Sequence, residues 1–139
     1  MNDRTAAPPT FLFVYGTLRP GHAPASVAAY VDRCACAGAG CTPGRLYDLR
    51  HYPGAVLDDD DAGRGQLVHG ELIEIPDDAT LRRLDAYEGY NLADPAGSLF
   101  VRTTCDVTTD DGRTVRAWVY VYNRDVAGAR PVPGGRYHR

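Results

Sequence analysis

The sequence contains no lysine, and arginine supplies all 15 of its basic residues. This absence excludes two kinds of site that depend on lysine, namely Schiff-base catalysis and the P-loop that binds nucleotide phosphates. The 18 acidic residues give a net charge of −3 and an isoelectric point near 5.7. Because nucleic-acid-binding domains usually carry a basic face, this balance argues against a nucleic-acid partner.

Long hydrophobic runs are also missing. No apolar stretch approaches the roughly 20 residues that a membrane-spanning helix requires, and residues 1–10 lack the apolar segment of a secretory signal. We therefore expect a cytoplasmic protein that does not contact membranes. A length of 139 residues, of which 44% are hydrophobic, suits a single domain with a buried core. We assign residues 1–10 to a flexible leader and residues 11–139 to that domain.

Cysteine is scarce and does not follow a metal-binding pattern. The four cysteines are Cys34, Cys36, Cys41 and Cys105. Structural zinc sites usually contain two cysteine pairs, each separated by about two to four residues, whereas this sequence has a C-x-C pair and no second pair. Nothing in the sequence marks an oxidising compartment that would favour disulfides. We expect buried, reduced thiols, with a metal site as the weaker alternative.

Other familiar catalytic and ion-binding motifs are absent too. Neither serine lies in a G-x-S-x-G sequence, and no two histidines have the i, i+4 spacing of a helical metal site. The glycines of residues 38–44 do not match the G-x-G-x-x-G of a dinucleotide-binding loop. Residues 58–61 are consecutive aspartates without the alternating spacing of a calcium loop. We expect these aspartates to form a solvated surface loop.

Apolar alternation and turn residues predict more strands than helices. The expected strands cover residues 11–15, 45–49, 55–57, 66–75, 99–108 and 114–122, with residues 34–41 as a further strand or a continuation of the first helix. The expected helices cover residues 25–31 and 79–87, and the expected turns cover residues 42–44, 52–54 and 110–112. An extended tail begins at residue 123. This order predicts an α+β fold with a mostly antiparallel or mixed sheet or barrel.

The helix predicted over residues 79–87 has recognisable ends. Asp77 or Asp78 can cap its N-terminus, and Gly89 stands where a glycine ends many helices. Glu88 then lies in the last turn, where the helix dipole disfavours an exposed carboxylate by about 0.3–1 kcal/mol. Because two nearby tyrosines would also remove water from it, we expect its pKa to rise toward neutrality, which suits a general base. A solvent-facing glutamate beside a helix cap is the plainer alternative.

A second segment that stands apart covers residues 15–18, with the sequence Y-G-T-L. The first predicted strand breaks at Gly16, and the loop that follows exposes backbone N–H groups that can hold a carboxylate or an oxyanion. Glycine also lacks the Cβ that would block the close approach of a ligand. Taken alone, such a segment is more often only a turn.

Together, the two segments resemble the γ-glutamylcyclotransferase-like family. The resemblance rests on F-V-Y-G-T-L at residues 13–18, V-H-G-E-L at 68–72, L-D-A-Y-E-G-Y at 84–90, F-V-R at 100–102 and A-W-V-Y-V-Y at 117–122. It covers residues 11 to 137 and is closest to short members that carry Y-G-T-L, including the γ-glutamylamine cyclotransferases. It implies a small mixed β-barrel or bent sheet with a few packed helices.

The resemblance also implies an activity and a site. The activity is cleavage of a γ-glutamyl amide by its own α-amino group, an acyltransferase- or lyase-type reaction that gives 5-oxoproline and a free amine without metal or organic cofactor. Glu88 matches the family's catalytic glutamate. The matching substrate-binding positions are Tyr15, Gly16, Thr17, Leu18 and Tyr120. The implied partner is a small-molecule γ-glutamyl substrate, and the oligomeric state is not indicated.

Two alternatives stay open at this point. A non-catalytic protein of the same fold would bind a small amino-acid-like ligand and pair Glu88 with its ammonium group, whereas an oligomeric structural protein has only the valine-rich hairpin in its favour.

For the substrate, Arg102 is the basic residue expected nearest the site, and it could instead pair with Asp106. We therefore expect simple γ-glutamyl amines to be cleaved in preference to glutathione, whose glycine carboxylate needs a cation.

Overall fold

The computed structural model describes residues 8–19, 21–57 and 66–137. Its strands are β1 (Phe11–Val14), β2 (Ala35–Asp48), β3 (Pro53–Leu57), β4 (Leu67–Glu74), β5 (Phe100–Thr109), β6 (Thr114–Tyr122) and β7 (Arg130–Pro131). Its helices are α1 (Ala25–Asp32) and α2 (Asp78–Glu88), with short 3₁₀ helices η1 (Pro95–Gly97) and η2 (Pro133–Gly135). The α+β class is confirmed. Most of the predicted leader and the whole predicted aspartate loop lie outside the described residues.

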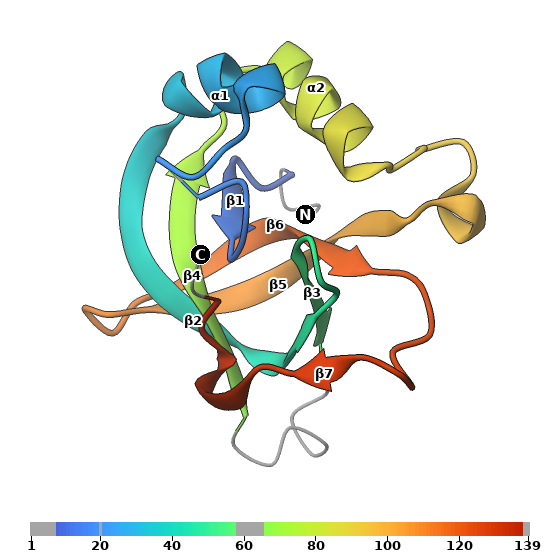
Figure 1. The fold of residues 1–139 in the computed structure, drawn as a ribbon. Helices are drawn as coiled ribbons and strands as arrows, with labels where there is room; N and C mark the ends of the chain where they lie inside the picture. The colour runs from blue at the N-terminus through green and yellow to red at the C-terminus, as the bar shows by residue number, and fades with distance from the viewer. Residues whose placement is uncertain (1–7, 20, 58–65, 138–139) are drawn as a thin grey trace, which may run out of the picture.

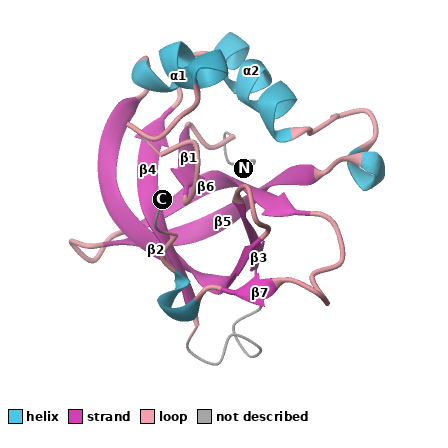
Figure 2. Cartoon of the chain, in the orientation of Figure 1, coloured by secondary structure: helices cyan, strands magenta, loops and turns pink. Residues whose placement is uncertain are grey.

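Five of the strands close into a barrel. They pair in the order β2-β4-β1-β6-β5, and β2 pairs again with β5 to complete the circuit. Within this barrel β1 runs parallel to β6 and the other neighbours are antiparallel, so the barrel is mixed. Figure 1 shows α1 and α2 side by side at one end, and the strands wrap beneath them (Figure 2). The mixed barrel that the resemblance implies is confirmed.

The turn predicted at residues 42–44 is wrong, because β2 continues through it. Pro43 pairs with β4, and the next residue, Gly44, pairs with β3. A Cβ on Gly44 would lie 2.7 Å from a carbonyl oxygen of β3. The P-G pair therefore marks a corner where one strand changes partners, a place where these residues are tolerated within a sheet. The turn predicted at residues 52–54 also ends early, since β3 begins at Pro53.

Apolar side chains form two cores, one inside the barrel and one between the barrel and the helices. The residues of β1 alternate between them, because Phe13 belongs to the barrel core while Leu12 and Val14 belong to the core beneath the helices. Burial on both faces explains why the sequence of β1 is continuously apolar rather than alternating. Leu84 of α2 is fully buried in the second core. This packing fixes α2 against the end of β1.

The ends of α2 agree with the sequence prediction. The side chain of Asp77 caps the N-terminus by accepting a hydrogen bond from the N–H of Thr80 at 2.8 Å. Gly89 follows the helix with a φ of 74°, the left-handed conformation that glycine adopts without strain. Glu88 is the last residue of α2, one residue beyond the predicted end of the helix and within its last turn, as predicted.

The predicted hairpin is confirmed, but the tail after it is more structured than predicted. β5 and β6 pair from Phe100 opposite Tyr122 to Thr108 opposite Thr114. In the tail, β7 pairs with β2, and Tyr137 is 6% exposed within the barrel core. The tail thus packs back onto the barrel instead of extending from it.

All four cysteines are unbridged. Cys34 and Cys105 are buried and Cys41 is half-buried, but Cys36 is exposed, so the prediction of buried thiols holds for two of the four cysteines and is wrong for Cys36. Among the residues that the structure describes, no three histidine, cysteine or acidic side chains are grouped as a metal site requires. None of the described helices is long and apolar enough to cross a membrane.

Candidate functional site

A cavity of about 180 Å³ lies where the end of β1, the loop after β1 and the C-terminal end of α2 meet. All six residues singled out from the sequence line it, namely Tyr15, Gly16, Thr17, Leu18, Glu88 and Tyr120. Phe13, Leu99 and Phe100 supply apolar wall. The fold therefore brings together residues as much as 105 positions apart in the chain.

The loop after β1 lines the cavity and carries unpaired backbone N–H groups. Within the described part of the chain, the N–H groups of Gly16, Thr17 and Leu18 have no hydrogen-bond acceptor. The loop is held through the Gly16 carbonyl, which accepts hydrogen bonds from the backbone N–H and the Nε of Arg19, both at 3.1 Å. Unpaired N–H groups beside a cavity are suited to bind a carboxylate or an oxyanion.

Position 16 requires a glycine because there is no room for a side chain, and not because of its backbone conformation. Its φ does not lie in the left-handed region, unlike that of Gly89. A Cβ at this position would lie 2.5 Å from Cγ of Pro53, which also lines the cavity. A larger residue would push the loop and Pro53 apart and so reshape the cavity wall.

Glu88 has the properties of a proton acceptor that works near neutral pH. Burial raises the pKa of its carboxyl group from 4.5 to about 8. Among the described residues, none donates a hydrogen bond to this carboxylate or forms an ion pair with it, so nothing offsets the loss of water. The sequence predicted the direction of this shift from the helix end and nearby tyrosines, and burial in the cavity wall is its cause.

Tyr15 links three parts of the site through its hydroxyl group. The hydroxyl donates to the backbone carbonyl of Tyr120 at 2.7 Å and accepts from the backbone N–H of Ala55 at 3.1 Å. Burial is the main reason that the pKa of Tyr15 lies far above its ordinary value, and the nearby Glu88 adds to it. Tyr15 therefore stays neutral and joins the end of β1 to β6 and β3.

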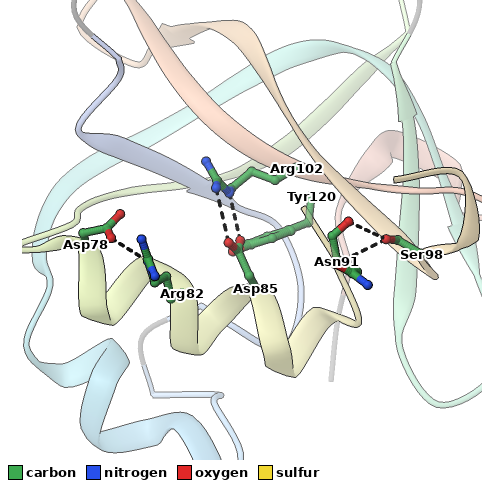
Figure 3. Close-up of polar contacts among 7 residues, drawn as sticks. All are labelled: Asp78, Arg82, Asp85, Asn91, Ser98, Arg102 and Tyr120. Carbon is green, nitrogen blue, oxygen red and sulfur yellow. Dashed lines mark hydrogen bonds and ion pairs between the residues drawn. The ribbon is translucent and has the colours of Figure 1, made fainter. Parts of the chain in front are cut away.

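A buried ion pair beside the cavity was missed by sequence reasoning. Arg102 of β5 donates to Asp85 of α2 from Nε at 2.8 Å and from Nη2 at 3.2 Å, with 11% and 12% of the two side chains exposed. The Tyr120 hydroxyl donates to the same carboxylate at 2.7 Å (Figure 3). The Arg102 guanidinium also lies over the Trp118 ring, 4.3 Å from its centre. Asp85 thus joins α2 to both strands of the hairpin.

Asp106, which the sequence offered as an alternative partner for Arg102, does not pair with it. Asp106 pairs with Arg116 at 3.0 Å on the exposed face of the hairpin, and Arg102 pairs with Asp85 instead. The sequence contained one indication that Asp85 lies near the site. Asp85 is three residues before Glu88 and so lies on the same face of α2. The site thus contains one carboxylate with a cationic partner and one without, beside unpaired N–H groups, an arrangement suited to moving a proton while an oxyanion forms.

The chain matches one protein family over nearly its whole length. Residues 12–139 match the family described as Gamma-glutamyl cyclotransferase, AIG2-like. Over 118 residues the chain is 39% identical to the gamma-L-glutamyl-butirosin B gamma-glutamyl cyclotransferase of Niallia circulans, a match that covers 82% of this chain and 67% of that protein. Over 91 residues it is 40% identical to the gamma-glutamylcyclotransferase family protein YtfP of Escherichia coli strain K12, covering 66% of this chain and 65% of YtfP. The chain thus spans about two thirds of the length of these curated relatives.

A solved structure has the same fold. The crystal structure of an AIG2-like protein from Mus musculus superposes with a TM-score of 0.69, covering 95% of this chain and 90% of that one. The two sequences are 24% identical, so this likeness concerns the fold alone.

The raised pKa of Glu88 makes the stability of the protein depend on pH. Because the folded chain holds this proton more tightly than the unfolded chain, its stabilising effect is complete below about pH 4.5 and is lost as the pH rises through about 8. Urea unfolding of the protein and of Glu88→Gln, which cannot titrate, should therefore show the free-energy difference moving in favour of Glu88→Gln between pH 5 and pH 8.5. Parallel pH profiles would mean that Glu88 titrates at its ordinary pKa.

Two ion pairs on α2 offer a matched test of the buried network. Asp85→Ala leaves the Arg102 charge buried and unpaired, which typically costs about 3–5 kcal/mol. Asp78→Ala breaks the Asp78–Arg82 pair, whose side chains are 71% and 79% exposed (Figure 3), and exposed pairs contribute about 0–1 kcal/mol. Chemical denaturation should rank the two losses in that order. Similar losses for both variants would show that Asp85 does not hold the site together.

Proposed function

The chain belongs to the family described as Gamma-glutamyl cyclotransferase, AIG2-like, and on this premise we propose that it cleaves a γ-glutamyl amide by cyclisation, releasing 5-oxoproline and a free amine. The observation that carries the proposal is the position of Glu88, a carboxyl group with a pKa of about 8 in the wall of a cavity that the loop with the unpaired N–H groups also lines. Its relative from Niallia circulans, named for the same type of reaction, supports it.

In the proposed reaction, the α-amino nitrogen of the substrate attacks its own γ-carbonyl carbon. Glu88, as the carboxylate, takes the proton that this nitrogen loses. The carbonyl oxygen becomes an oxyanion, which the N–H groups of residues 16–18 hold. When the bond from the γ-carbon to the leaving nitrogen breaks, Glu88 gives its proton to that amine. The α-ammonium nitrogen loses two protons in all, one to Glu88 before it attacks and one after the new bond has formed. Both end on the leaving amine, which is released as an ammonium ion, so bonds and protons balance and no protein nucleophile is consumed.

The energetics of this chemistry explain why so few residues suffice. The substrate carries its own nucleophile, and holding it in a five-membered-ring geometry can lower the barrier by about 7–11 kcal/mol. The α-amino group has a solution pKa of about 8, close to the value of about 8 for Glu88, so proton transfer between them is nearly balanced. The protein then has to supply mainly shape, a base and donors for the oxyanion.

The remaining residues of the proposed site shape the cavity and hold the loop in place. The Tyr120 hydroxyl donates its hydrogen bond to Asp85, so we propose that Tyr120 shapes the cavity wall. Its oxygen can still accept a hydrogen bond from the substrate ammonium. Thr17 and Tyr87 hydrogen-bond through their hydroxyl groups at 3.1 Å at the cavity rim. Leu18 is 4% exposed and anchors the loop in the core beneath the helices.

Replacing the base tests the proposal. Glu88→Gln keeps the size of the side chain but cannot accept a proton, so release of 5-oxoproline from a γ-glutamyl amide should fall by about 10²-fold or more. In the unmodified protein, activity should rise with pH as Glu88 loses its proton near pH 8. The measurement is steady-state turnover, with 5-oxoproline detected by chromatography.

A binding control separates loss of chemistry from loss of the site. Glu88→Gln should still bind 5-oxoproline, because the loop that holds the carbonyl is unchanged. Turnover of Glu88→Gln near the original rate would show that another group is the base. Binding of γ-glutamyl amides without any product from the unmodified protein would instead favour a non-catalytic binding protein.

A further inference from the structure

A second cavity, of about 400 Å³, adjoins the first. The two share Gly16, Thr17 and Tyr87 in their walls, so the Thr17–Tyr87 hydrogen bond lies at the boundary between them. The residues found only in the second cavity include Arg19, His22, Pro24 and His51. Two compartments that meet at the loop with the unpaired N–H groups suggest one compartment for each side of the bond that is cleaved.

The second cavity is basic, although the chain as a whole is acidic. Arg19, His22 and His51 line it, and no acidic residue is among the described residues that do so. The helix α1 begins at its edge, next to Pro24, with no side-chain cap and no acidic residue in its first turn. The positive end of the α1 dipole therefore adds to the charge of Arg19.

Arg19 is the group in this cavity best placed to bind an anion. Its Nε is bonded to the Gly16 carbonyl, which fixes the half-buried side chain beside the loop. Within residues 8–19, 21–57 and 66–137, no carboxylate pairs with Arg19, whereas Arg82, Arg102 and Arg116 each have one. Its terminal nitrogens thus keep the planar pair of donors that matches a carboxylate.

We propose that the second cavity receives the leaving amine, and that Arg19 selects leaving amines that carry an anionic group such as a carboxylate. The inference rests on the proposed function, because it places the γ-glutamyl group in the first cavity against Glu88. The scissile amide then lies at the shared loop, and the substituent on its nitrogen extends past Thr17 and Tyr87 toward Arg19.

This inference reverses the substrate preference expected from the sequence. That expectation took Arg102 as the basic residue nearest the site, and on that basis favoured simple amines over glutathione. Arg102 is instead paired with Asp85, and its guanidinium also contacts the Trp118 and Tyr90 rings. The cation that a carboxylate needs comes from Arg19, whose place in the second cavity depends on how the loop folds.

The test compares two substrates that differ only in terminal charge, γ-glutamylglycine and γ-glutamylglycinamide. The unmodified protein should show a kcat/KM at least about tenfold higher for γ-glutamylglycine, which corresponds to about 1.4 kcal/mol in transition-state binding. In Arg19→Gln the ratio should fall to between one and three. Arg82→Gln, a change on the exposed face of α2, is the matched control and should keep the original ratio.

The outcomes separate this inference from the proposed function. If both substrates yield 5-oxoproline with equal kcat/KM, or if Arg19→Gln slows both by the same factor, the cyclisation stands and the role of Arg19 is overturned. If neither substrate yields 5-oxoproline, the proposed function fails. Calorimetry with the same two compounds then still tests the second cavity. The unmodified protein must bind γ-glutamylglycine at least several-fold more tightly than γ-glutamylglycinamide, and Arg19→Gln must remove this difference.

Discussion

The carboxylate of Asp85 is the point on which the arrangement of the site depends. It accepts hydrogen bonds from Arg102 of β5 and from the Tyr120 hydroxyl of β6, and so joins α2 to the hairpin. The backbone carbonyl of Tyr120 is bonded in turn to the Tyr15 hydroxyl at the end of β1. One buried network therefore sets the distance between the helix that carries Glu88 and the loop that carries the unpaired N–H groups. A buried pair of this kind is not by itself a large source of stability, but removing one partner is costly, which favours a single geometry.

Asp85 and Glu88 lie on the same face of α2 and illustrate how environment divides the work between two carboxyl groups. Asp85 has a guanidinium group and a hydroxyl group as partners, whereas Glu88 has neither and lies in a largely apolar wall. Burial without a partner raises the pKa of Glu88 to about 8. The first carboxyl group thus holds the structure, and the second is available to accept and return a proton near neutral pH.

Local patterns in the sequence predicted the parts of the fold that depend on neighbouring residues. The caps of α2 and the β5–β6 hairpin follow from Asp77, Gly89 and alternating apolar residues, and all three were placed correctly. The course of β2 through Pro43 could not be predicted in this way, because it depends on strands that are distant in the sequence.

The site, too, has parts that the sequence predicted and parts that it did not. Its residues were identified from the resemblance of several short segments to a known family, and the structure places all of them in one cavity wall. The pairing of Asp85 with Arg102, 17 positions apart, and the placing of Arg19 beside a second cavity are long-range or conformational facts that no local pattern encodes.

The central claim, that the substrate cyclises on itself, is tested most directly by carrying out the reaction in water enriched in heavy oxygen. Because the α-amino nitrogen forms the new bond to the γ-carbon, the account predicts 5-oxoproline without heavy oxygen and a stoichiometric amount of free amine, both measured by mass spectrometry. Glutamate that carries heavy oxygen in its γ-carboxyl group would show that water attacks the amide, and would contradict the account.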